Sequence, residues 1–144
     1  MRLLNKLGRS FMLKRIAPSV FVEDGQAVYV EKAYPWEPVA FPVRIRNMSP
    51  VRVTVRGVQY LILKEGRPIQ CVIWMRGWHY ASNGLQVSMP DYVSATRESG
   101  AVLRYNRLLV SPAADLPLGV EGFVTFDSAY GEFEQSFLIR PLPL

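Results

Sequence analysis

The sequence has very little of what catalytic and metal-binding sites are built from. Among its 144 residues there is one cysteine, Cys71, and one histidine, His79. An intrachain disulfide is therefore impossible, and two such side chains fall short of the four ligands of a structural zinc site. The sequence also lacks a glycine-rich phosphate loop and a Gly-x-Ser-x-Gly nucleophile motif. We therefore expect a protein that is not an enzyme, with no catalytic residues, no metal and no cofactor.

Cys71 is the one residue that could act as a cysteine nucleophile, with His79 as its base. It lies in an alternating stretch, residues 69–75, in which every second residue from position 69 is apolar or cysteine. A cysteine in such a pattern behaves as a small hydrophobic residue. We therefore expect Cys71 to be buried, unreactive and unligated.

The sequence also lacks a long apolar run, and it has no acidic residue before Glu23. A transmembrane helix needs about 20 apolar residues, and a secretory signal needs an unbroken apolar core of about 7 to 15. We therefore expect a cytoplasmic protein, with peripheral attachment to a membrane left open. An acid-free start that contains arginine is also typical of a mitochondrial presequence, which stays an alternative.

The net charge of +5 comes entirely from the first fifteen residues, because the rest of the chain has equal numbers of basic and acidic residues. At the helical period of 3.6, apolar residues and cations of this segment fall on opposite faces. We predict an amphipathic basic helix that ends near residue 13, before Pro18, within an N-terminal unit of residues 1–17. Such a helix either packs on its own domain or binds a protein, a membrane or RNA. The predicted contact residues are Arg2, Leu3, Leu4, Lys6, Leu7, Arg9, Phe11, Met12, Lys14 and Arg15.

Beyond Pro18 the apolar residues recur with a period of two, which is typical of β-strands. Turn residues separate the alternating stretches, with turns predicted at 23–25, 64–68 and 128–131. We expect an all-β domain over residues 18–144, an immunoglobulin-like or fibronectin-like sandwich of about eight strands that follows the short basic helix. The predicted strand stretches are 20–22, 27–30, 43–46, 51–63, 69–75, 85–89, 101–110, 120–126 and 132–139.

Residues 41–69 contain a strand, a corner with asparagine and proline, and a long strand that ends in a glycine turn. This stretch resembles the group-2 late-embryogenesis-abundant domain, also called the water-stress-and-hypersensitive-response (WHy) domain. Residues 119–126 resemble the end of that domain, before its closing strand. The resemblance implies a sandwich without catalytic residues, in proteins linked to stress protection and often found near membranes.

The residues that carry the resemblance imply structural roles. Asn47 is expected to make hydrogen bonds in the corner, and Gly57 and Gly66 are expected to supply backbone freedom. The corner departs from the Asn-Pro pair of the domain, because two residues separate Asn47 from Pro50.

Four arginines alternate with apolar residues along two successive strand patterns. If these strands pair, their side chains share one surface that suits phosphate or carboxylate groups, and the surface is a candidate site for nucleic acid or another anionic partner. The alternative, which we favour, is that Glu132 and Glu134 pair with the arginines across the sheet. The four residues are Arg44, Arg46, Arg52 and Arg56.

Aromatic residues cluster between positions 74 and 80. Trp74 fits a strand and is expected in the core. Trp78 and Tyr80 are two residues apart, so they would share a face of an extended chain. If that face is exposed, beside Arg76, these two residues are candidate contacts for a protein or for nucleic-acid bases. The alternative is that they are core residues.

Three classes of function remain open. The first, which we favour, is a non-catalytic interaction or structural module, a sandwich docked into a larger assembly through its basic helix. The second is a peripheral membrane protein of the stress-protection type, with the helix on anionic lipid. The third is an RNA or ribonucleoprotein-binding protein that uses the helix and the arginine surface. The partner and the oligomeric state do not follow from the sequence.

Overall fold

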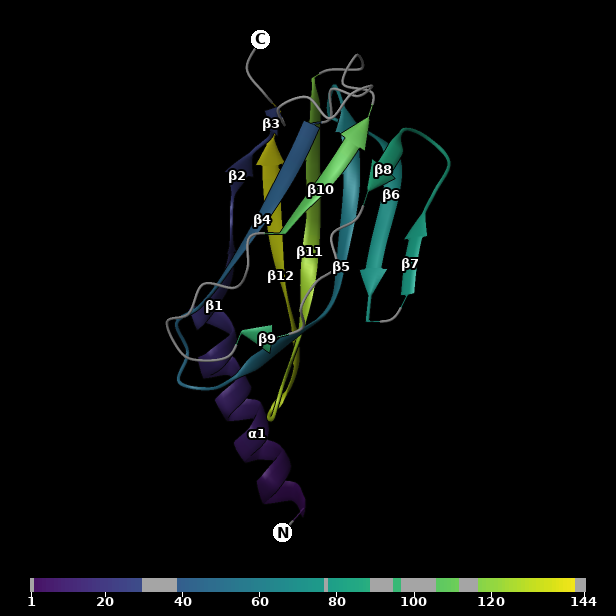
Figure 1. The fold of residues 1–144 in the computed structure, drawn as a ribbon. Helices are drawn as coiled ribbons and strands as arrows, with labels where there is room; N and C mark the ends of the chain where they lie inside the picture. The colour runs from purple at the N-terminus through teal and green to yellow at the C-terminus, as the bar shows by residue number, and fades with distance from the viewer. Residues whose placement is uncertain are drawn as a thin grey trace.

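The computed structural model describes residues 2–29, 39–76, 78–88, 95–96, 106–111 and 117–141. These residues form two β-sheets packed face to face, with one α-helix at the N-terminal end (Figure 1). The predicted all-β sandwich is confirmed. The described part of the chain has twelve strands rather than about eight, because several strands are only two to four residues long.

The two sheets differ in size. The small sheet has five strands in the order β1-β4-β10-β8, with β3 beside β4. Its strands are β1 (Val20–Glu23), β3 (Val28–Tyr29), β4 (Val39–Asn47), β8 (Gln86–Ser88) and β10 (Asn106–Ser111). The large sheet has seven strands in the order β2-β12-β11-β5-β6-β7, with β9 beside β5. Its strands are β2 (Gly25–Gln26), β5 (Val53–Lys64), β6 (Arg67–Met75), β7 (Trp78–Ala81), β9 (Ala95–Thr96), β11 (Leu118–Ser128) and β12 (Gly131–Arg140).

The core lies between the sheets, because alternate residues of the long strands are apolar and side chains alternate across a strand. Tyr60 on β5 is fully buried and meets Phe137 of β12 edge-on, with ring centroids 5.9 Å apart. The buried residues of β4 and β5 that form the centre of the core are Val39, Phe41, Val43, Ile45, Val53, Val55, Val58, Tyr60 and Ile62.

The chain changes sheet at Asp24, where the sequence predicted a turn over residues 23–25. β1 pairs with β4 in the small sheet, and β2 pairs in parallel with β12 in the large sheet. At this crossing, Oδ1 of the Asp24 carboxylate accepts a hydrogen bond of 3.0 Å from the backbone N–H of Leu138 on β12. The expected turn is therefore a sheet-to-sheet crossing.

The corner between β4 and β5 has the hydrogen bonds expected of Asn47. Its Oδ1 accepts bonds from the backbone N–H and the hydroxyl of Ser49, at 2.9 and 2.6 Å. Its Nδ2 donates to the carbonyl oxygen of Val51 at 2.8 Å. Asn47 and Ser49 are both fully buried, so these bonds satisfy polar groups that water cannot reach.

The two glycines of the WHy-like stretch have different roles. Gly66 has a φ of 74° and follows Glu65 with a φ of 53°, which gives the tight turn predicted between β5 and β6. Gly57 lies within β5 and has no positive φ, but it stands at an irregularity in the pairing with β11, where Thr125 is opposite Gly57 and Phe126 is opposite Val55. A Cβ at position 57 would lie 3.2 Å from the carbonyl oxygen of Trp74, so the residue serves close packing against β6.

Helix α1 (Arg2–Ile16) is longer than predicted and continues directly into a 3-10 turn, η1 (Ala17–Ser19). Pro18 does not end the helix near residue 13, because it sits at the start of η1, where its missing N–H is not needed. The burial of Ile16 in the core, at 1% exposure, favours this continuation.

Candidate functional site

The C-terminal end of α1 packs on the sandwich. Ile16 belongs to the core, and Met12 packs against the same core from the preceding turn. Nε2 of Gln135 on β12 donates a hydrogen bond of 2.5 Å to the carbonyl oxygen of Ala17. These contacts fix one end of the helix to the first half of β12.

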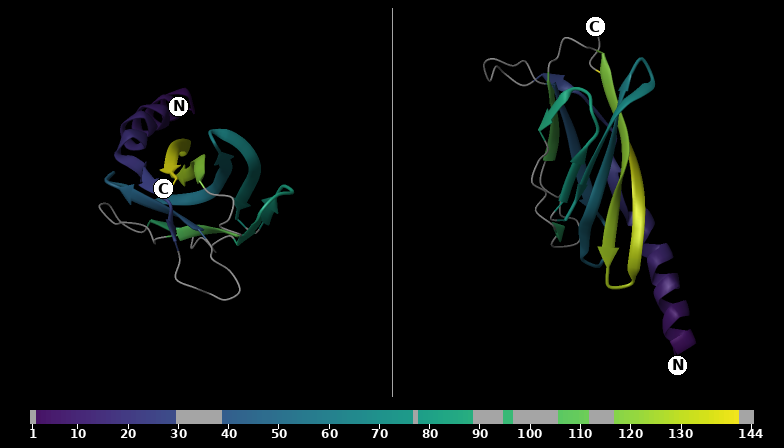
Figure 2. Two further views of the ribbon diagram at one scale, coloured as in Figure 1. Left: turned by 90° about the horizontal axis from the view of Figure 1, so that it is seen from above. Right: turned by 90° about the vertical axis from the view of Figure 1, so that its right-hand side faces the viewer.

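The N-terminal end of α1 extends away from the sandwich, beyond the turn between β11 and β12 (Figures 1 and 2). Phe11 is 61% exposed, and the guanidinium carbon of Arg15 lies 5.7 Å from the centre of its ring. Phe11 and Ile16 are five residues apart, so at about 100° per residue they lie on roughly opposite sides of the helix. The helix therefore presents an aromatic ring to solvent on the side opposite the sandwich.

This arrangement divides the predicted contact residues of the helix. Met12 packs on the sandwich, whereas Phe11, Lys14 and Arg15 are exposed. The other predicted contact residues lie outside the side chains that the structure describes, although the helix backbone includes them. They are Arg2, Leu3, Leu4, Lys6, Leu7 and Arg9.

The predicted arginine surface does not form, because its two strands belong to different sheets. Arg44 and Arg46 lie on β4 of the small sheet, and both pair with Glu23 on β1, at 3.6 and 3.1 Å. Arg56 lies on β5 of the large sheet, and Arg52 is exposed just before that strand. The four guanidinium groups are thus divided between two layers of the sandwich.

The expected pairing with acids of the last strand is confirmed for one arginine only. Arg56 pairs with Glu132 on β12 and, at 3.7 Å, with Asp127 on β11. Glu134 forms no ion pair in the described part of the chain. All of these arginine side chains are at least 40% exposed, so each pair contributes less than about 1 kcal/mol to stability.

The aromatic residues after β6 form an edge strand that the sequence did not predict. Trp78 and Tyr80 lie on β7, are 50% and 46% exposed, and stack with ring centroids 6.1 Å apart. Trp74 is buried at 3% exposure, as expected. The alternation of large aromatic residues at positions 78 and 80 was the signal for this strand.

Cys71 is only half-buried, so the expectation of a buried thiol is wrong. Both faces of β6 are apolar, and the structure turns the face of Val72 and Trp74 into the core, which leaves Cys71 on the outward face. His79 pairs with Trp74 in the register of β6 and β7, so it lies on the face opposite Cys71. The two residues therefore do not form a nucleophile and base.

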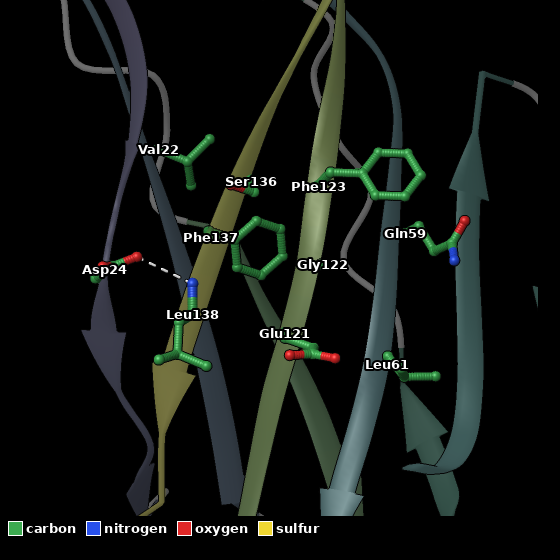
Figure 3. Close-up of a pocket in the computed structure, with 10 residues that line it drawn as sticks. All are labelled: Val22, Asp24, Gln59, Leu61, Glu121, Gly122, Phe123, Ser136, Phe137 and Leu138. Carbon is green, nitrogen blue, oxygen red and sulfur yellow. Dashed lines mark hydrogen bonds between the residues drawn. The ribbon is translucent and has the colours of Figure 1, made fainter. Parts of the chain in front are cut away.

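A groove of about 730 Å³ lies along β5, β11 and β12, next to the segment that joins β1 to β2 (Figure 3). In register, Glu121 on β11 stands between Leu61 on β5 and Leu138 on β12. Phe123 and Asp24 also line the groove. This groove was not predicted from the sequence, although the apolar residues at outward positions of these strands were a signal for it.

The described residues contain no group of three or more histidine, cysteine, aspartate or glutamate side chains that could hold a metal ion. Within the same part of the chain, no helix has the length and apolar character needed to cross a membrane.

Similarity to known proteins is confined to the fold. No family model matches the sequence, and no curated protein matches it significantly. The crystal structure of the structural genomics target SoR45 has a TM-score of 0.55 and 14% identity, over 90% of this chain and 92% of that chain. The solution structure of a proposed late embryogenesis abundant (LEA) protein has a TM-score of 0.52 and 14% identity, over 94% of this chain and 79% of that one. The chain thus has a two-sheet fold similar to that of a proposed LEA protein.

Proposed function

We propose that the chain is a non-catalytic interaction module of the LEA or WHy type, in which the sandwich is a rigid body and α1 is an arm that docks it onto a protein partner. The observation that carries the proposal is the unequal burial of the helix. Ile16 is 1% exposed in the core, whereas Phe11 is 61% exposed only five residues earlier. A helix that is fixed at one end and extends at the other is placed to contact another molecule.

The composition of the arm supports the same role. Its first fifteen residues contain five cations and no acid, which favours an anionic surface as the binding site. A helix of this length is marginally stable in water by itself, so contact with a partner would also stabilise its exposed turns.

The absence of catalysis is part of the proposal, and two observations support it. Cys71 and His79 lie on opposite faces of the large sheet and so do not cooperate as nucleophile and base. The fold is similar to that of a proposed LEA protein, and the resemblance of residues 41–69 implies a sandwich without catalytic residues.

The docking role can be tested with a photoreactive amino acid at position 11 of the full chain, expressed in cells. The matched control places the same amino acid at position 21, because Phe21 is also an exposed phenylalanine, 38% exposed, but lies on β1 of the body. We expect protein adducts of discrete mass at position 11 and not at position 21. Changing Lys6 and Arg9 to glutamate should abolish them, because the arm then loses its attraction to an acidic surface.

Two results would contradict docking on a protein. One is the absence of protein adducts at position 11, and the other is a set of adducts that survives the Lys6→Glu and Arg9→Glu changes. Lipid adducts at position 11, together with sedimentation of the chain with phosphatidylglycerol vesicles but not with phosphatidylcholine vesicles, would favour a membrane surface instead. The exposure of Phe11 beside Lys14 and Arg15 is the observation that supports binding to a membrane surface as the second candidate function.

A further inference from the structure

Strand β7 is the last strand of the large sheet, and all four of its residues are exposed. It pairs with β6 on one side, and in the part of the chain that the structure describes no strand pairs with its other side. Figure 1 shows β7 as the outermost strand on that side of the sheet. An open strand edge of this kind is a place where a strand from another molecule can pair.

The hydrogen bonds between β6 and β7 show which backbone groups face the open edge. The N–H of Ser82, the residue after β7, donates to the carbonyl oxygen of Cys71 on β6 at 2.9 Å. Bonded and non-bonded residue pairs alternate along an antiparallel pair of strands, so every second residue of β7, counted back from Ser82, bonds to β6. His79 and Ala81 are the intervening residues. Their N–H and C=O groups therefore point to the open edge, where no described residue bonds to them.

The opposite edge of the large sheet is covered by the chain itself. There β2 pairs with the end of β12, Oδ1 of Asp24 accepts a bond from the N–H of Leu138, and Leu13 of α1 lies close to Gly131. β12 also contains three charged residues, whereas β7 contains no lysine, arginine, acid or proline. Charged residues and proline are what keep strand edges from pairing with other molecules. The chain thus protects one edge of this sheet and leaves the other able to pair.

The side chains next to the open edge are large and apolar. Trp78 and Tyr80 stack on the outward face of β7, and each is about half exposed. In the register they lie opposite Met75 and Ile73 of β6, and Met75 is itself exposed. Apolar side chains that gather on an exposed surface mark a place that another molecule covers.

We propose that the chain forms a homodimer in which β7 pairs antiparallel with β7 of a second copy, across a two-fold axis at His79. The two His79 residues then exchange two backbone hydrogen bonds. Opposed residues of paired strands lie on the same face, so Trp78 of each copy lies opposite Tyr80 of the other. The four rings form one row, and the two large sheets become one continuous sheet.

A second copy fits this edge better than an unrelated strand does. The occupant needs backbone groups at the same spacing and aromatic side chains on the same face, and β7 of a second copy supplies both. Arg76, the cation just before the strand, lies opposite Ser82 of the other copy in this register, so the pairing opposes no like charges. The helix α1 does not obstruct the contact, because it is fixed beside β12 at the other edge of the sheet (Figure 1).

The size of the contact indicates a dimer that dissociates readily. A buried aromatic side chain covers roughly 150 to 250 Å², so four rings that are half exposed contribute on the order of 400 Å². Backbone pairing and the flanking residues raise the total toward about 1,000 Å², the lower limit for a specific interface. We therefore expect monomer and dimer to exchange in the micromolar range of concentration.

The dimer goes beyond the docking role of α1, because it uses a different surface. Each copy keeps its helix at the outer edge of the continuous sheet, so the dimer carries two docking arms. A partner with two binding sites would then hold the dimer more tightly than a single chain.

Charge changes at position 79 test the dimer, with the mass in solution measured by sedimentation equilibrium over a range of concentrations. The mass of the wild type should rise from one chain toward two as the concentration increases. His79→Lys and His79→Glu should each keep the mass of one chain, because position 79 then faces a like charge in the other copy. An equal mixture of the two variants should regain the mass of two chains, because the facing charges then have opposite sign.

Two further sets of variants accompany this measurement. Gln86→Lys and Gln86→Glu are the matched control, because Gln86 is an exposed residue of β8, the edge strand of the small sheet. Both should dimerise like the wild type. Ala81→Pro removes an N–H that points to the open edge but no bond to β6, so it should weaken the dimer. All of these variants should keep the far-ultraviolet circular dichroism of the wild type.

Three results would overturn the homodimer. One is a wild-type chain that keeps the mass of one chain up to millimolar concentration. Another is a dimer that persists in both His79 variants, because that dimer would not use β7. The last is a monomeric wild type in which a photoreactive amino acid at position 80 forms adducts to a different protein, which would assign the edge to that protein. Adducts at position 11 would be unaffected by any of these results, so the docking role of α1 stands or fails separately.

Discussion

Ile16 determines which part of the N-terminal segment belongs to the sandwich. Its side chain is 1% exposed, although it follows five helical residues of which Phe11 is 61% exposed. The sequence did not indicate this role, because Pro18 two residues later is normally a reason to end a helix earlier. Burial of an isoleucine in the core outweighs that local preference, since a fully buried aliphatic side chain stabilises the fold by about 1.5 to 3 kcal/mol.

The substitution Ile16→Ala should therefore lower the free energy of unfolding by about 2 to 5 kcal/mol, because it leaves a cavity in the core. Phe11→Ala is the matched change on the exposed side of the same helix and should alter that free energy by no more than about 0.5 kcal/mol. Urea unfolding followed by circular dichroism measures both. Equal effects of the two substitutions would show that the helix does not enter the core at Ile16.

Asn47 is a residue whose role the sequence did predict. The two residues between Asn47 and Pro50 alter the corner of the WHy domain, yet the side chain of Asn47 still bonds to Ser49 and Val51. A short polar side chain next to a turn has few other partners within reach, which is why this role could be inferred from local sequence.

Asn47→Ala should lower the free energy of unfolding by about 1 to 3 kcal/mol, because the N–H of Ser49 stays buried without an acceptor. Asn83→Ala is the control, since Asn83 is an exposed turn residue. The midpoint of urea unfolding should fall for Asn47→Ala and stay close to wild type for Asn83→Ala. A wild-type midpoint for both variants would mean that the corner is not held by these bonds.

At the scale of the elements, the strands were predictable where one face is apolar and the other polar. In β4, Val43 and Ile45 alternate with Arg44 and Arg46, and the structure follows that pattern. In β6 both faces are apolar, so periodicity could show a strand but could not show which face enters the core. Packing against the small sheet determines which face of β6 enters the core, and it leaves Cys71 on the outward face.

The pairing of strands could not be predicted from the pattern. β4 and β5 follow each other along the chain with only five residues between them, which suggested neighbours in one sheet. The buried corner at Asn47 instead carries the chain from the small sheet to the large one. Which strands pair depends on contacts with strands far along the chain, such as β10 and β11, and these contacts cannot be read from local sequence. For this reason the prediction that the four arginines share one surface was wrong.

At the scale of the whole molecule, the chain combines a sandwich with one helix that only half belongs to it. The charge of the sequence already separated these parts, because the first fifteen residues hold the entire net charge. The groove on the large sheet, in contrast, required the structure, since its residues come from β5, β11, β12 and the crossing at Asp24. A separable arm and body is the central claim about this molecule.

Removal of residues 2–10 tests that claim most directly, because the shortened chain keeps Met12, Ile16 and Ala17, which pack on or bond to the sandwich. The two quantities to measure are the β-sheet signal in circular dichroism during thermal unfolding and the yield of protein adducts from a photoreactive amino acid at position 11. We expect an unchanged β-sheet signal, a midpoint within a few degrees of the full chain, and loss of the protein adducts. A shortened chain that loses its β-sheet signal, or that keeps the protein adducts of the full chain, would contradict a separable docking arm.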